Sequence, residues 1–211
     1  MGGAGPFASL WRNEGNGFHD AGWSIGAMSV RAWLAAWVLT AAVAVNAGTI
    51  DPQQAALTPT EDGYALAAEF AVDLGAQFEE AVARGVPLYF VIEFDLTRKR
   101  WYWVNEHIAD RRIEYRLAYN ALTRQYRLSA GGLHRNFVTL AEALRVIARI
   151  GALQVVDKSA VKPGETYDAA LRLSLDRSQL PKPLQVDALA NRDWQVDART
   201  LRWQFVPGDS K

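Results

Sequence analysis

The sequence predicts a mainly β protein, an antiparallel β-sandwich with an immunoglobulin-like pattern of seven or eight short strands and two short helices in its connections. Several segments alternate strictly between apolar and polar residues, and turn signals separate them. Only two segments place apolar residues at helical spacing. Residues 48–211 are long enough to form one domain with its own core, and no internal repeat or second domain is evident.

The first predicted unit is a hairpin followed by a helix. An alternating segment begins at Tyr64, and the turn-forming residues 60–63 precede it. A strand around 53–58 is therefore expected to pair with it. Helical spacing of apolar residues over 76–84 then predicts a short helix that ends at Gly85.

A second hairpin is predicted from the next alternating segment, residues 87–96. Residues 97–100 supply its tip, and residues 101–105 supply the returning strand. The tip contains no Gly or Asn for a two-residue turn, so a four-residue loop on a type I turn is expected. Basic and aromatic residues are adjacent here, which is also typical of surfaces that bind single-stranded nucleic acids.

The register of this hairpin decides between the two interpretations. A four-residue loop places Leu96 opposite Trp101 and Phe94 opposite Trp103, so both indole rings are expected in the core. The neighbouring charges then belong to an exposed tip. The N-terminal part of the chain, discussed below, predicts export, and together with that prediction this register argues against nucleic acid as a partner.

The central part of the chain predicts further antiparallel strands. A polar connection over 105–110 is expected to lead into a long strand over 111–120. A tight connection then gives a strand over 124–129, and Gly131 and Gly132 are expected to break the sheet.

The last third of the chain predicts one helix and two strands. Residues 139–142 form a capping box for a helix that is expected to end at Gly151. Residues 167–176 alternate as a strand, and residues 201–205 mark a closing strand. Because prolines donate no backbone hydrogen bond, residues 180–185 are expected to be extended and outside any central strand.

The N-terminal part predicts export from the cytoplasm. Met28 and Arg31 precede an uncharged apolar run, 32–45, which ends in small residues. This arrangement is typical of a signal peptide, here residues 28–47, with cleavage expected after Ala47. The protein is therefore expected to be periplasmic.

An uncleaved membrane anchor is the alternative. Residues 32–50 carry no charge and approach the length that spans a bilayer, so membrane association of an inner-membrane protein that faces the periplasm stays open. Residues 1–27 show no periodicity and are interpreted as a disordered leader or the product of a start codon placed too far upstream. The folded part is then a single domain, residues 48–211.

The chain lacks the usual signatures of catalysis and of cofactor binding. It contains no cysteine, which excludes disulfides, thiolate zinc sites and cysteine catalysis. No nucleotide-binding, serine-hydrolase or zinc-protease motif is present, and no cofactor is expected. His107 and Asp110 are too few ligands for zinc. Glu93 and Asp95 leave open a hydrolase with a dispersed acidic site.

Charge is distributed unevenly along the neutral chain. Residues 48–97 carry one basic and nine acidic side chains, whereas residues 98–135 carry nine basic and three acidic ones. The basic segment suggests a surface for an anionic ligand or an acidic patch of an envelope protein. The alternative is that acidic and basic strands neutralise one another across a sheet. The residues of the candidate surface are Arg98, Lys99, Arg100, Arg116, Arg124 and Arg127.

Several long blocks of the sequence resemble a proteobacterial family of exported proteins, the domain-of-unknown-function family 4390. The resemblance spans residues 48–205 and is carried by the blocks VPLYF, LTRKRWYWV, YRLAYNALTRQYRLSAGGL, LAEAL, LRLSLDRSQLPKPLQV and NRDW. It implies an uncharacterised extracytoplasmic protein, with a link to a sensor kinase suggested by the genes that often accompany the family. It implies no catalytic residues.

These observations favour a non-catalytic binding or protein-interaction module of the cell envelope. The hydrolase is the enzymatic alternative, and a purely structural envelope component is the third.

Overall fold

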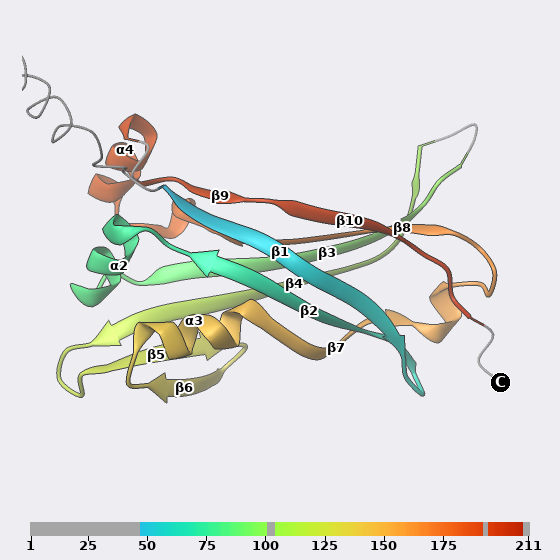
Figure 1. The fold of residues 1–211 in the computed structure, drawn as a ribbon, viewed down its shortest axis with the longest axis horizontal. Coiled ribbons are helices and arrows are strands. Elements are labelled where there is room, and N and C mark those ends of the chain that lie inside the picture. Colours follow the sequence, from blue (N-terminus) through green and yellow to red (C-terminus); the bar gives the residue numbers. More distant parts are fainter. Residues whose placement is uncertain (1–46, 101–103, 192–193, 209–211) are drawn as a thin grey trace, which may run out of the picture. The chain divides into compact units, whose positions relative to one another are not determined.

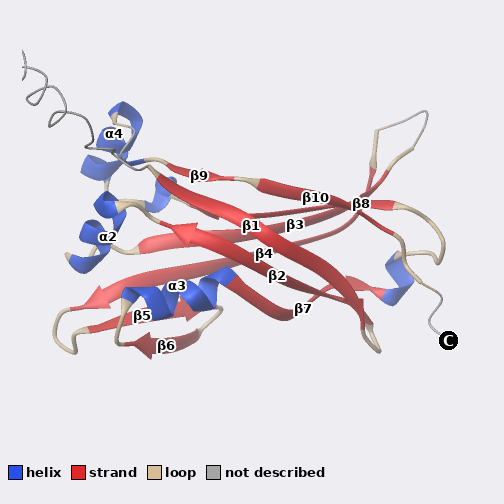
Figure 2. Ribbon diagram, in the orientation of Figure 1, coloured by secondary structure: helices blue, strands red, loops and turns tan. Residues whose placement is uncertain are grey.

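The computed structural model describes residues 47–100, 104–191 and 194–208. The described residues form a mainly β domain of two sheets (Figures 1 and 2). The strands are β1 (Gly48–Pro59), β2 (Gly63–Asp73), β3 (Leu88–Arg98), β4 (Glu106–Asn120), β5 (Gln125–Ala130), β6 (Leu133–Phe137), β7 (Arg149–Asp157), β8 (Tyr167–Leu175), β9 (Val196–Ala198) and β10 (Thr200–Phe205). The α-helices are α2 (Ala76–Ala83), α3 (Leu140–Ala148) and α4 (Lys182–Ala190).

The two sheets pack their apolar faces against each other. One sheet has the order β7-β2-β1-β9, and the other has the order β10-β8-β3-β4-β5-β6. The alternation predicted for β2, β3 and β8 is confirmed, because the apolar face of each lies in the core. Fully or almost fully buried side chains from these strands include Leu66, Phe70, Phe90, Ile92, Phe94, Leu171 and Leu173.

The last strands join the sheets along one side. β9 runs parallel to β1 in the four-stranded sheet, and β10 pairs antiparallel with β8 in the six-stranded sheet. Only Arg199 separates them, so residues 196–205 pass from one sheet to the other (Figure 1). An immunoglobulin-like fold is not confirmed. β3 to β6 form a meander of consecutive strands, unlike the ABED and CFG sheets of immunoglobulin domains.

The first hairpin and both predicted helices are confirmed. β1 and β2 pair antiparallel over most of their length, and α2 follows directly. The capping box of α3 is present: the Thr139 side chain accepts from the Glu142 backbone N–H, and the Glu142 side chain accepts from the Thr139 N–H. Helix α3 ends at Ala148 rather than at Gly151, and β7, which the sequence did not predict, starts at the next residue.

The register predicted for the β3–β4 hairpin is wrong. Leu96 pairs with Ala109 and Phe94 with Arg111, so the returning strand starts later than expected and includes most of the predicted polar connection. A β-bulge between Leu96 and Thr97 shifts the ladder further. Glu106 lies opposite Arg98 of β3 in this ladder, and its carboxylate accepts a hydrogen bond from the Arg98 side chain. The core positions predicted for Trp101 and Trp103 lie outside the described residues.

Two other predictions of local structure are wrong. Gly131 and Gly132 do not end the sheet but form the turn between β5 and β6, where both have positive φ angles, 53° and 87°. Residues 182–190 form α4 rather than an extended segment. Pro181 and Pro183 are compatible with this helix because N–H groups in the first helical turn have no intrahelical acceptor.

Candidate binding groove

A groove opens where β2 loses its neighbour. β7 pairs with β2 from Gly63, opposite Asp157, to Glu69, opposite Arg149. β2 then continues to Asp73, but the chain that precedes Arg149 is helical rather than extended. Among the described residues, no strand pairs with residues 70–73 of β2 on this side. This stretch is therefore a free strand edge that faces α3.

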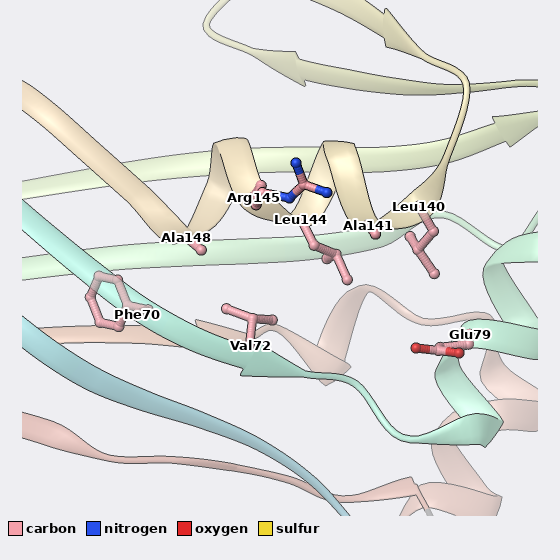
Figure 3. A pocket seen from close by; sticks show the side chains of 8 residues that line it. All are labelled: Phe70, Val72, Glu79, Leu140, Ala141, Leu144, Arg145 and Ala148. Atoms are coloured by element: carbon pink, nitrogen blue, oxygen red, sulfur yellow. The ribbon is translucent and has the colours of Figure 1, made fainter.

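The groove has a volume of about 420 Å³ and lies between β2 and α3 (Figure 3). Side chains of α3 point into it from one side and those of β2 from the other, and α2 contributes Glu79 at one end. The residues that line it are Phe70, Val72, Glu79, Leu140, Ala141, Leu144, Arg145 and Ala148.

The floor of the groove is apolar and firmly packed. Phe70 is 4% exposed and Leu144 9% exposed, so both belong to the core as well as to the groove. A second hollow of about 410 Å³ shares Phe70, Arg145 and Ala148 with the groove and reaches Gly151. The apolar surface therefore extends along the free edge of β2 and onto the beginning of β7.

Charged side chains at the rim differ in their partners. Arg149 donates a hydrogen bond to Glu69 at 2.9 Å, and this bond lowers the pKa of the Glu69 carboxyl. Arg145 is exposed, and no carboxylate in the described part of the chain forms an ion pair with it. Burial raises the pKa of the Tyr126 phenol on β5, and the charges of Tyr119 and of the rim residue Glu79 raise it further. Arg145 is thus the rim cation that is available to a ligand.

The basic tip predicted from the sequence is tied to carboxylates of the domain itself. Arg98 donates to both Glu106 and Glu165, and Arg100 donates to Glu106 at 2.6 Å. Lys99 Nζ lies 3.3 Å from Asp168 Oδ2. These contacts neutralise the three basic side chains.

These contacts shift the pKa values of Arg98, Glu106 and Glu165. The hydrogen bonds that Arg98 donates to the Glu165 and Glu106 carboxylates raise the pKa of its guanidinium. Arg98 in turn lowers the pKa of Glu165, and Arg100 and Arg98 lower the pKa of Glu106. Arg98 also belongs to strand β3 rather than to an exposed tip, since its side chain is only 23% exposed.

The other three basic residues of the predicted surface lie apart from the tip. Arg116 Nε donates to the Tyr89 hydroxyl at 3.2 Å, and Arg127 Nε donates to Asn136 Oδ1 at 3.3 Å. Arg124 lies in the turn after β4 with φ 54°. Because β4 starts at Glu106 and rises about 3.4 Å per residue, the tip and this turn are tens of ångströms apart along the strand. The six residues do not form one continuous patch.

The structure does not extend the two other candidate sites, the metal site at His107 and Asp110 and the acidic site at Glu93 and Asp95. His107 Nε2 lies 3.1 Å from Asp110 Oδ1, but the described residues contain no group of three side chains that could hold a metal ion. Glu93 Oε1 accepts from Arg112 at 2.6 Å across the β3–β4 ladder. This ion pair and the Glu69–Arg149 pair show the cross-strand neutralisation expected as the alternative to a basic binding surface.

Sequence patterns identified the groove residues as apolar faces but not as a binding site. Phe70 and Val72 lie at alternate positions of the strand predicted from Tyr64 onward, and Leu144 lies in the helix predicted to follow the capping box at 139–142. The signal that was missed is the β-rich segment 149–157, which follows α3 without a loop. The groove exists because the pairing of that segment stops at Glu69.

The fold and the groove define a two-sheet β domain with an open, largely apolar groove beside the free edge of β2. The family model described as "Domain of unknown function (DUF4390)" matches residues 47–204, and the chain belongs to this family. No curated protein and no solved structure matches the chain. Among the described residues, no helix is both long and apolar enough to cross a membrane.

Proposed function

We propose that this protein is a non-catalytic, exported binding module that takes up an extended apolar segment of an envelope protein in the groove between β2 and α3. The observation that carries the proposal is the free edge of β2 at residues 70–73, which borders a groove with an apolar floor. A segment added as a strand gains backbone hydrogen bonds from such an edge, and its alternate side chains enter the adjoining hollows.

The shape of the groove suits a short strand better than a helix. Four residues of free edge span about 13 Å at the rise of a β-strand. An α-helix satisfies its own backbone hydrogen bonds, so it would leave the backbone groups of the free edge without partners. We therefore infer that the partner is extended and that every second residue is apolar.

The charge at the rim of the groove sets a second requirement for the partner segment. Arg145 lies at the rim without an acidic partner among the described residues, whereas Arg149 is held by Glu69. An acidic residue in the partner segment would pair with Arg145. The basic tip is a weaker candidate surface, because Arg98, Lys99 and Arg100 already have carboxylate partners.

Export is part of the proposal. Strand β1 begins at Gly48, directly after the expected cleavage site, so cleavage there would leave the domain intact. An envelope protein is then the expected class of partner, and a sensor kinase is the candidate that the family resemblance suggests. A hydrolase with a dispersed acidic site remains the alternative function, but no observation of the described residues favours it.

A phage-displayed library of random twelve-residue peptides, panned on the full chain, tests the proposal. We expect enrichment of sequences that alternate apolar residues and contain an Asp or Glu. The variant Ala148→Trp fills the groove and should weaken binding of the selected peptides at least about tenfold, which corresponds to about 1.4 kcal/mol. Arg145→Gln should weaken the acidic peptides selectively.

Ala160→Trp provides the matched control, because it adds the same ring at an exposed position outside the groove. It should leave binding unchanged. Failure to enrich any alternating sequence, or equal binding by the Ala148→Trp variant, would refute the groove as the binding site. Saturable binding of dodecanoate in place of peptides would refute a peptide partner.

A further inference from the structure

A polar hollow lies on the outer face of the six-stranded sheet, near the tip of the β3–β4 hairpin. Its volume is about 740 Å³, which exceeds that of the groove between β2 and α3. It has acidic, basic and amide side chains around the small side chain of Ala170. Its lining residues are Asp95, Thr97, Lys99, Asn105, Asp168, Ala169, Ala170, Arg202, Trp203 and Gln204.

The β-bulge in the β3–β4 ladder contributes to this hollow. The ladder shifts between Leu96 and Thr97, and beyond this point both strands turn away from their earlier direction (Figure 1). Thr97 Oγ1 then donates to the Asp168 carbonyl at 3.4 Å, and Lys99 Nζ lies 3.3 Å from Asp168 Oδ2. These contacts fix the bent end of β3 against β8 at one end of the hollow.

One row of the sheet places opposite charges on either side of a small residue. Asp95 of β3 and Arg202 of β10 are both in register with Ala170 of β8. Two strand spacings separate their Cα atoms, which is about 10 Å. Within the described residues neither side chain has an ion-pair partner, and both are exposed. The Ala170 methyl group leaves the space between the two charges open.

The surroundings strengthen the difference in charge across the hollow. Asp110 lies directly opposite Asp95 on β4, which makes the potential at this side of the row more negative. Asp168 is already neutralised by Lys99. The hollow therefore presents an anionic side at Asp95 and a cationic side at Arg202, with no net charge among its four lining charges.

We propose that this hollow binds a small zwitterion, a molecule with an ammonium group that meets Asp95 and an acidic group that meets Arg202. Arginine binds carboxylates and phosphates through paired N–H donors, and an ammonium group donates to a carboxylate. Gln204 and Asn105 supply further amide groups on the side of the hollow nearer the hairpin tip. Short free peptides and phosphoethanolamine share this chemistry.

This site is distinct from the groove that carries the proposed function. The hollow lies on β3, β8 and β10, whereas the groove lies on β2, α2 and α3. Neither set of lining residues includes a member of the other. Binding of a zwitterion can therefore succeed or fail independently of peptide binding in the groove.

Titration of the ¹⁵N-labelled full chain, followed by NMR, tests the inference. Glycylglycine should cause saturable shifts in the backbone amide signals of Asp95, Ala170 and Arg202. N-acetyl-glycylglycine, which lacks the ammonium group, and glycylglycinamide, which lacks the carboxylate, should each bind at least about tenfold more weakly. A parallel titration with phosphoethanolamine shows which of the two sources binds more tightly.

Two charge-neutralising variants locate the site, and two controls match them. Asp95→Asn and Arg202→Gln should each weaken glycylglycine binding at least about tenfold. Asp157→Asn and Arg177→Gln remove the same charges at exposed positions outside the hollow and should leave glycylglycine binding unchanged. Equal binding of the zwitterion and both blocked analogues would overturn the inference. So would binding that survives both Asp95→Asn and Arg202→Gln, or no saturable binding of either zwitterion.

Discussion

Replacement of Gly63 tests the pairing of β2 with β7, on which the groove depends. Gly63 lies opposite Asp157 and has φ 155°, a backbone conformation close to exclusive to glycine. A Cβ atom at this position would lie 2.1 Å from the Val156 carbonyl oxygen and 2.8 Å from the Lys158 nitrogen. Both neighbours are backbone atoms, so the clash cannot be relieved by a side-chain rotation.

The expected cost of Gly63→Ala follows from these contacts. Overpacking costs about 1–3 kcal/mol, and the strained φ angle costs about 1–3 kcal/mol more. Reduced entropy of the unfolded chain offsets about 0.4–1 kcal/mol. We therefore expect a loss of about 2–5 kcal/mol in the free energy of unfolding, measured by urea denaturation.

Gly151→Ala is the matched control, because a Cβ there meets no atom within 4 Å. It should change the free energy of unfolding by less than about 1 kcal/mol. If Gly63→Ala were no more destabilising than this control, the pairing of β7 with β2 described above would be incorrect.

Three further predictions concern the core, a helix end and the ion pairs at the hairpin tip. Phe78→Ala should lower the free energy of unfolding by about 3–5 kcal/mol, since this ring is fully buried in α2; a loss below about 1 kcal/mol in urea denaturation would contradict its burial. Thr139→Ala should cost about 1 kcal/mol by removing the α3 cap, whereas Thr139→Ser should retain most of it in the same assay. Because the fold lowers the pKa values of Glu106 and Glu165, their ionised forms stabilise it fully at pH values above the ordinary glutamate pKa of 4.5. This contribution is lost as the pH falls through the lowered pKa values of the folded state. Arg98→Met should therefore flatten the decrease of stability below about pH 4.5, and an unchanged pH profile would argue against these ion pairs.

Much of the fold could be predicted because its signals are local. The alternation of β2 from Tyr64 to Val72 and the capping box at Thr139 each specify an element within about ten residues of sequence. β8 and β10 were predicted for the same reason.

Features that depend on distant residues could not be predicted in this way. The segment 105–110 resembles a polar loop, yet it joins β4 because Glu106 pairs with Arg98 and because a bulge shifts the ladder. Prolines near Lys182 suggested an extended chain, although a first helical turn tolerates them equally well. Local patterns do not distinguish between these outcomes.

The candidate sites illustrate the same limit. Basic residues from Arg98 to Arg127 suggested one surface because they are close in sequence, but several of them have partners on other segments. The groove depends on the point at which β7 stops pairing with β2, at Glu69, which is a property of tertiary structure. The sequence patterns predicted the apolar residues that line the groove only as parts of the core.

Hydrogen exchange at the free edge of β2 tests the central claim most directly. The full chain is measured with and without a peptide selected from the library, and the amides of residues 70–73 are compared with those of residues 63–69, which already pair with β7. Strand addition predicts slower exchange in the stretch 70–73 when the peptide is bound and little change in 63–69. Bound peptide with unchanged exchange at residues 70–73 would contradict the account.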